Sequence, residues 1–223
     1  MLEIKNTEVF GLERSLQASG NPRSIGEINT SNGNYTLIGN NGNGNHDLIR
    51  GKKLGSVDIG SGHDNFLSGI DVYYDVKYSL YWSPEFQRYH FNQIISSQSK
   101  MHRLTEMGMM EDFKSMFNKY VCKEAIELIH AAILLFNSLE LGWNKNVYDT
   151  EQAWKDAKYE TFMIIISNLP AGFEQWMTIK TNYLQLKTMY YQRKGHKLQE
   201  DWGAFCEWCL TLPYFSKLTG IKE

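Results

Sequence analysis

The segment "QRYHFNQIISSQSK", Gln87–Lys100, combines residue types that could bind a nucleotide. Arg88 is a cation that stays charged, and Lys100 follows about three helical turns later. Donors suited to a phosphate or to the edge of a pyrimidine lie between them: Ser96, Ser97, Gln98 and Ser99. The alternative is that the segment is the exposed polar end of a helix, so the sequence leaves open a ligand site or a solvated face.

A second stretch, "TNYLQLKTMYYQRKGHKLQEDW", is the most basic part of the chain. Asn182 and Arg193 are eleven residues apart, which is close to three helical turns, so both can face the same cavity. Neighbouring aromatic side chains could stack on a planar ring: Tyr183, Tyr190, Tyr191 and Trp202. The alternative is a solvated basic helix whose aromatic residues belong to the core.

The remaining candidates are a turn histidine and a pair of thiols. "GSGHDNF" places His63 on a glycine-flanked turn, where the backbone can approach a ligand closely, although an ordinary turn explains the same residues. Cys206 and Cys209 have CxxC spacing without the further ligands that zinc needs, so we favour two buried thiols. No GxSxG, P-loop or Rossmann sequence is present, and the sequence shows no recognisable catalytic triad.

Composition and charge limit the class of protein. A chain of 223 residues can bury a sizeable core without metal or disulfides. The formal net charge of -2 disfavours sequence-independent binding of nucleic acid. Three cysteines without a framework suggest a reducing compartment, and we expect no signal peptide at the N-terminus, hence a cytoplasmic protein. The most apolar stretch, Ala125–Leu141, contains polar residues and is expected to be a core helix and not a membrane span.

Hydrophobic periodicity predicts an α+β fold, helix-rich with a small antiparallel sheet, in a single domain over residues 1–223. Residues 3–19 are expected to form a short strand that leads into a helix. "GIDVYYDVKYSLYW" alternates polar and apolar positions and predicts a half-buried strand. Residues 20–62 are rich in Asn and Gly and predict a long loop, with a hairpin at 34–45.

The rest of the chain is expected to be helical. Ser83 is a predicted N-cap ahead of Pro84, and in the helix that follows Phe86, His90 and Ile94 would share one face. Further helices are predicted at roughly 107–119, 122–141, 150–168, 172–194 and 199–211. Asp149 or Thr150 would cap one of them, and Gly195 would terminate another.

Taken together, these stretches resemble the flavin-dependent thymidylate synthases, the ThyX type. That family has a Gly-His turn, a strand, an Arg-His-Arg triplet followed by Ser, and later an Asn and an Arg at the spacing seen here. The counterparts in this chain are His63, the strand "GIDVYYDVKY", the triplet Arg88–His90, Ser99, and the pair Asn182 and Arg193, with Leu198-Gln199 where the family has Ala-Gln. The resemblance covers roughly residues 55–105 and 173–215.

The resemblance implies a reaction and assigns roles to residues. Reduced FAD, bound between subunits of a homotetramer, would serve methylene transfer from a folate to dUMP, with NADPH as the reductant. The cofactor would do the chemistry while the protein binds and orients. The residues assigned to the cofactor are His63, Arg88, Tyr89, His90 and Asn182. Those assigned to the nucleotide are Arg88, Gln98, Ser99, Lys100 and Arg193. No catalytic side chain is assigned, since no protein nucleophile is required.

The chain also differs from the family pattern. Tyr89 and His90 stand where the family has His and Arg, and Ser68 stands where a carboxylate is expected. An arginine expected after the motif serine falls at Lys100 or Met101. Replacing Arg by His removes a permanent charge and a bidentate donor. The sequence therefore supports an alternative function, a nucleotide-binding protein that sequesters a nucleotide or binds a protein partner. A helical interaction module is a third hypothesis, and a phage or bacterial origin would suit the Asn/Gly-rich loop.

Overall fold

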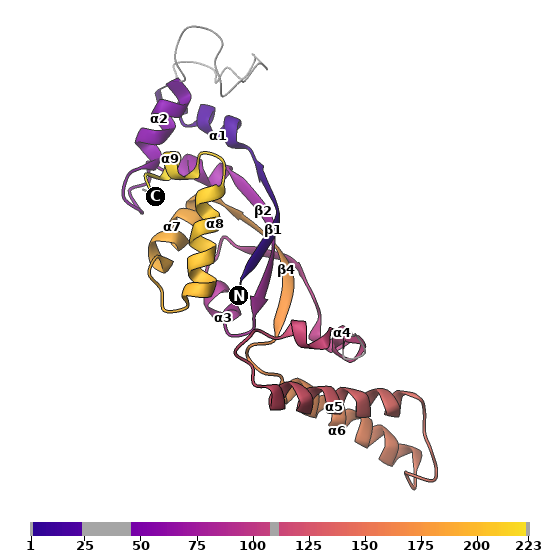
Figure 1. Ribbon diagram of the computed structural model, residues 1–223. Coiled ribbons are helices and arrows are strands. Elements are labelled where there is room, and N and C mark those ends of the chain that lie inside the picture. The colour runs from indigo at the N-terminus through magenta and orange to yellow at the C-terminus, as the bar shows by residue number, and fades with distance from the viewer. Residues whose placement is uncertain (1, 24–45, 108–111, 222–223) are drawn as a thin grey trace. The chain divides into compact units, whose positions relative to one another are not determined.

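The structure is a computed structural model that describes residues 2–23, 46–107 and 112–221 (Figure 1). Its four-stranded antiparallel sheet has the strand order β1-β2-β4-β3. The strands are β1 (Glu3–Phe10), β2 (Asp71–Ser79), β3 (Gln93–Ser97) and β4 (Glu174–Asn182). The α-helices are α1 (Leu12–Ala18), α2 (His46–Gly55), α3 (Ser83–Phe86), α4 (Lys100–Met107), α5 (Lys123–Glu140), α6 (Glu151–Asn168), α7 (Tyr183–Arg193), α8 (Ala204–Thr211) and α9 (Phe215–Thr219). The expected α+β class is confirmed.

The chain divides into two compact units, which we call the hairpin unit and the sheet unit. The hairpin unit comprises residues 77–84 and 97–177, and the sheet unit comprises 2–76, 85–96 and 178–223. Strands β2 and β4 pass from one unit into the other. The single domain expected from the sequence stays a prediction.

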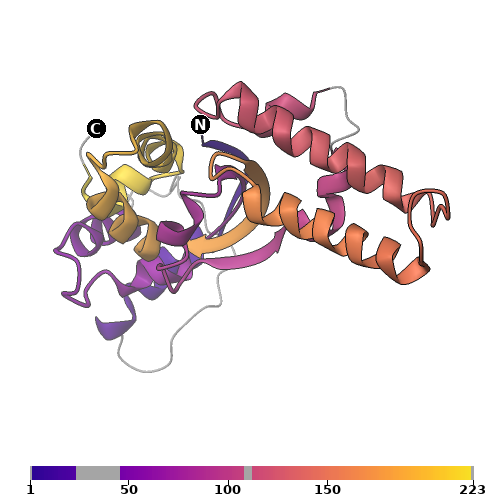
Figure 2. The ribbon, with the colours of Figure 1, turned by 90° about the horizontal axis from the view of Figure 1, so that it is seen from below.

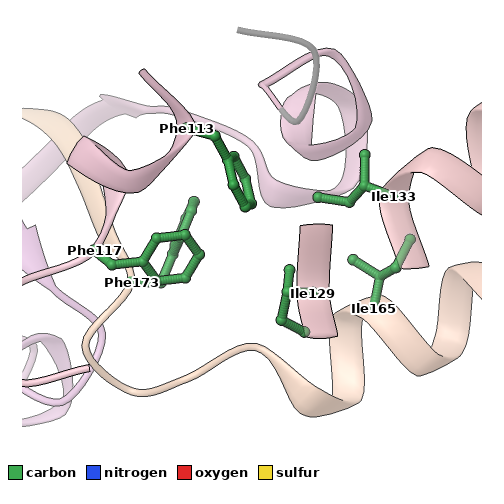
Figure 3. Packing of buried hydrophobic residues seen from close by; sticks show 6 residues of the cluster. All are labelled: Phe113, Phe117, Ile129, Ile133, Ile165 and Phe173. Carbon is green, nitrogen blue, oxygen red and sulfur yellow. The ribbon is translucent and has the colours of Figure 1, made fainter. Parts of the chain in front are cut away.

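The hairpin unit is built on α5 and α6, which lie side by side in both ribbon views (Figures 1 and 2). The side chain of Thr150 accepts a hydrogen bond from the Ala153 backbone N–H at 3.1 Å and so caps α6. The buried core of this unit consists of Phe113, Phe117, Ile129, Ile133, Ile165 and Phe173 (Figure 3). The core helix expected over Ala125–Leu141 is thus confirmed as most of α5. Within the described ranges, no helix is long and apolar enough to cross a membrane.

The sheet unit buries one face of β2 and most of α7. Val72, Tyr74 and Val76 are buried on β2, as the alternation of the sequence predicted. Cys206 and Cys209 on α8 are free thiols, and their expected burial is confirmed. Burial raises the pKa of the Cys206 thiol to about 11 and that of Cys209 well above its usual range. Helix α7 ends before Gly195, whose positive φ of 76° makes it the predicted terminator.

Three expectations about secondary structure are wrong in part. The loop expected over 20–62 contains helix α2 at His46–Gly55, while the hairpin expected at 34–45 lies outside the described residues. The helix expected over 172–194 is a strand in its first half, because Glu174–Asn182 alternates buried and half-buried positions with a period of two. The helix expected over 107–119 contains only the 3-10 turn Phe113–Met116 within residues 112–119.

The helix that begins at Ser83 is also much shorter than expected. It ends at Phe86, and Gln93–Ser97 form the exposed edge strand β3. The adjacent β-branched residues Ile94 and Ile95 favour this extended conformation. The shared helix face expected for Phe86, His90 and Ile94 is therefore wrong, and the segment Gln87–Lys100 is a turn followed by a strand rather than a polar helix end.

Candidate functional site

Asn182 and His90 line the same small pocket of the sheet unit, which we call the Asn182 pocket. Asn182 ends β4 and caps α7, since its Oδ1 accepts a hydrogen bond from the Gln185 backbone N–H at 2.9 Å. The pocket has a volume of about 140 Å³ and is lined by Asp71, His90, Phe91, Gln93, Lys180, Thr181 and Asn182. Two residues that the resemblance assigns to the cofactor are thus brought together by the fold.

Hydrogen bonds to α7 hold the turn that carries His90. The Phe91 backbone N–H donates to Gln185 Oε1 at 3.3 Å, and the Asn92 amide contacts Met189 Sδ at 3.4 Å. These contacts hold the two residues that follow His90 against α7, while the His90 side chain stays exposed. His90 is therefore available to a ligand without rearrangement of the turn.

The charges in the Asn182 pocket are partly neutralised. Lys180 Nζ lies 3.1 Å from Asp71 Oδ2, and this hydrogen bond raises the pKa of Lys180 above its usual range. Thr181 is 2% exposed, and its hydroxyl has no hydrogen-bond partner among the described residues. Burying a hydroxyl without a hydrogen-bond partner costs folding free energy. The Thr181 hydroxyl is therefore a hydrogen-bonding group that the fold leaves unsatisfied in the pocket.

Arg193 lies at the other end of α7, in a network of its own. Its Nε donates to the Tyr89 hydroxyl at 2.7 Å and its Nη1 donates to Glu85 Oε2 at 3.0 Å. The guanidinium carbon lies 4.4 Å from the centre of the Trp202 ring, within range of a cation–π interaction. Glu85 Oε2 also accepts the Trp202 indole N–H at 2.7 Å, and His196 Nε2 lies 3.6 Å away. We call these five residues the Arg193 network.

Burial of the network affects the ionisation of Tyr89. Tyr89 is buried, and burial raises the pKa of its phenol above the usual range, although the hydrogen bond from Arg193 acts in the opposite direction. The phenol therefore stays neutral and serves as an acceptor for Arg193.

The cavity expected to be shared by Asn182 and Arg193 is not formed by the Asn182 pocket, since its lining does not include Arg193.

Lys187 of α7 ties the segment that carries His63 to the core. Its ammonium group donates to Gly55 O at 2.9 Å, Val57 O at 2.6 Å and Asp64 Oδ2 at 2.7 Å. The side chains of Lys187 and Asp64 are only 1% and 3% exposed. All three donors of the ammonium are thus used, and we call this arrangement the Lys187 clamp. It fixes both ends of the turn while the His63 side chain remains exposed.

A larger hollow opens beside His63. It has a volume of about 910 Å³, and its lining mixes basic and apolar side chains. The basic ones are His46, Arg50, Lys53 and His63, and the large apolar ones are Ile49, Leu54 and Phe66. Arg50 is held by Asp47 at 2.6 Å and by the Ser19 hydroxyl at 2.9 Å. Such a hollow can accept an anionic group together with a planar ring.

The linings of the two pockets include none of the other residues that the resemblance names. Arg88 is exposed on the turn of the sheet unit. Gln98, Ser99 and Lys100 belong to the hairpin unit, where α4 begins at Lys100. Gln98 Oε1 accepts the Trp176 backbone N–H at 3.1 Å, so this amide is used to extend the pairing with β4. Their binding roles, like those of the other named residues, stay predictions.

The sequence did not identify the two acidic partners, Glu85 in the Arg193 network and Asp64 in the Lys187 clamp. Glu85 was visible only as an acid in a helix first turn, and nothing in its local sequence points to Arg193. Lys187 did carry a signal, because it lies four residues after Tyr183 and three before Tyr190, both of which are buried. A lysine on an apolar helix face predicts a buried carboxylate partner, although the sequence does not identify it as Asp64.

Comparison with known proteins finds solved structures with a similar fold. Neither models of protein families nor curated protein sequences match the chain. Solved structures do: thymidylate synthase X from Helicobacter pylori with FAD and dUMP has a TM-score of 0.64 and 14% identity, over 98% of this chain and 97% of that one. A second structure of the flavin-dependent enzyme from the same organism, complexed with FAD and dUMP, has a TM-score of 0.60 and 15% identity over 97% of both chains. The ThyX-like fold expected from the motifs is thereby confirmed.

Proposed function

We propose that this chain binds FAD and a pyrimidine nucleotide and catalyses a flavin-dependent modification of the pyrimidine C5 position, such as methylation of dUMP with a folate donor. The observation that carries the proposal is the meeting of His90 and Asn182 in one pocket of a ThyX-like fold. The two similar structures hold FAD and dUMP.

The hollow beside His63 fits an anionic cofactor with an aromatic ring. Arg50, Lys53 and His63 supply basic groups around about 910 Å³, and Phe66 supplies an apolar wall. When bound, FAD would supply the redox chemistry. The protein side chains would bind and orient it, with the Lys187 clamp holding the His63 turn in place. No side chain is assigned as a nucleophile or proton donor.

The proposal extends to the assembly and the other ligands. Arg88 is exposed and free to meet a phosphate, and Lys100 begins α4. As in the family that the motifs resemble, the active form would be a homotetramer, with NADPH as the reductant. The protein would act in the cytoplasm of a bacterium or of a cell infected by a phage.

The absorbance spectrum of the purified protein tests this function. We expect flavin absorbance near ~450 nm, either as purified or after incubation with FAD. Asn182→Ala and His90→Ala should each weaken FAD or dUMP binding at least tenfold, while Asn146→Ala, an exposed amide in the hairpin unit, should not. A colourless protein that takes up no FAD would rule out the flavin-dependent reaction.

A nucleotide-binding protein without the reaction is the second candidate, and the position of Tyr89 favours it. Tyr89 stands where the family that the motifs resemble has His, and its hydroxyl accepts a hydrogen bond from Arg193. Calorimetric titration with a panel of nucleotides separates the two candidates. Tight nucleotide binding without FAD uptake would support this function, and the absence of any nucleotide binding would exclude it.

A further inference from the structure

Strand β3 is the most exposed strand of the sheet. All the residues of Gln93–Ser97 are exposed, whereas the neighbouring strand β4 buries one of its faces. The side chains of Ile94 and Ile95 point to opposite faces of the sheet because the two residues are consecutive, and they are 43% and 55% exposed. The described part of the chain therefore leaves both faces of β3 uncovered.

Strand β3 also lies at an edge of the sheet. The strand order β1-β2-β4-β3 places β4 on one side of β3 and, among the described residues, no strand on the other. On that open side every second residue of an edge strand presents its backbone N–H and C=O outward. The open edge of β3 is thus a template to which a further strand can be added.

The two edges of the sheet differ in how they are protected against pairing. Strand β1, at the other edge, carries the charged residues Glu3, Lys5 and Glu8. Its Asn6 has a positive φ of 50°, a kink that disfavours a regular ladder. Strand β3 has no charged residue, no proline and no positive φ. Because uncharged edges with β-branched side chains pair readily with further strands, the chain protects β1 and leaves β3 open.

We propose that β3 pairs in antiparallel orientation with β3 of a second copy of the chain, around a two-fold axis at Ile95. A second copy is the partner that the sequence supports, because it brings an equally exposed, uncharged strand of the same length. With the two copies of Ile95 opposite each other, β-branched side chains pack together and Ile94 faces a serine, so no like charges meet. This inference rests on the self-association included in the proposed function and names its contact, but it does not require flavin.

Exchanging the charge at residue 95 tests the pairing. Ile95→Lys places two positive charges opposite each other in the proposed pair, so self-association measured by sedimentation equilibrium should weaken at least tenfold. Ile95→Glu should weaken it likewise. An equimolar mixture of the two variants should associate at least tenfold more tightly than either alone, because opposite charges then meet. Ile59→Lys, which changes an isoleucine of similar exposure outside β3, should associate as the wild type does.

Hydrogen exchange measures the pairing at the backbone. Amides of β3 that do not bond to β4 should exchange at least tenfold more slowly in the assembled wild type than in the monomer, obtained by dilution or with Ile95→Lys. Amides of β1 should exchange equally in both states. A wild type that is monomeric at every concentration, a mixture that associates no better than either variant, or β3 amides that exchange equally fast in both states would each overturn the inference. Flavin absorbance judges FAD binding separately, so the two proposals can fail independently.

Discussion

The Lys187 clamp and the Asn182 pocket lie in the same unit but differ in how fully their polar groups are hydrogen-bonded within the fold. Lys187 directs all three donors to Gly55, Val57 and Asp64 inside the fold. In the pocket, Thr181 keeps a buried hydroxyl without a partner in the described part of the chain, and His90 is exposed. A ligand gains little from groups that are already satisfied and more from groups that are not. The clamp is therefore expected to govern stability, and the pocket to govern binding.

The largest effect is expected at the Lys187 clamp. Lys187→Met leaves Asp64 as a buried charge without its partner, and such losses cost about 3–5 kcal/mol. Urea unfolding followed by circular dichroism measures the change in unfolding free energy. Lys197→Met, on an exposed side chain, is the matched control. A loss below about 1 kcal/mol would show that the clamp does not anchor the His63 turn.

The Arg193 network should contribute less to stability, because Glu85 is 30% exposed. Arg193→Met removes the charge contacts to Glu85 and Tyr89 but keeps part of the apolar stem. We expect a loss of about 1–3 kcal/mol in unfolding free energy. A double-mutant cycle with Glu85→Gln measures the coupling of the pair. Strictly additive losses in that cycle would contradict an interaction between the two side chains.

At the Asn182 pocket, substitutions should affect stability and ligand binding to different degrees. Asn182→Ala removes the cap of α7 and should cost about 1 kcal/mol, whereas Asn182→Asp retains a capping oxygen and should cost less. Both changes should weaken FAD or dUMP binding at least tenfold if the pocket holds the ligand. If Asn182→Asp binds these ligands as the wild type does, the amide has only the capping role.

At neutral pH the smallest effect is expected from the thiols of α8, because their contribution changes only at higher pH. Burial raises the pKa of Cys206 to about 11, so the folded state favours the protonated thiol. This contribution to stability is fully present below the unfolded pKa, near ~8.5, and is lost as pH rises toward 11. Cys206→Ala should flatten the decline in unfolding free energy between about pH 8.5 and 10.5. An unchanged slope would show that Cys206 does not contribute to it.

Much of the fold followed from local patterns. The alternation through Val72, Tyr74 and Val76 identified β2, and polar caps identified α6. Strand β4 was missed because its Gln, Met and Lys residues are favourable in a helix. Its alternation of buried and half-buried positions depends on pairing with β2, which the local sequence does not show. Strand β3 was missed because Pro84 correctly marked a helix start, and the β-branched pair Ile94 and Ile95 is too short a signal to show where that helix ends.

The candidate site was predictable in part, for physical reasons that differ between residues. His90 and Asn182 were named from motif order, and the turn after α3 brings them together. The partners of Arg193 and Lys187 could not be named, because Glu85 and Asp64 are more than a hundred residues away in the chain. Such pairings depend on how β2 and β4 align, and no local pattern encodes that alignment.

The discontinuity of the sheet unit also bears on how the protein is made. Residues 97–177 separate the part of this unit that carries His63, Glu85 and His90 from the part that carries Asn182 and Lys187. On a ribosome adding about 5–20 residues per second, the first part waits roughly ten seconds for the second. Neither the Lys187 clamp nor the Asn182 pocket can form before the second part has been synthesised. The hairpin unit, whose buried core residues lie between Phe113 and Phe173, is therefore synthesised before the sheet unit is complete.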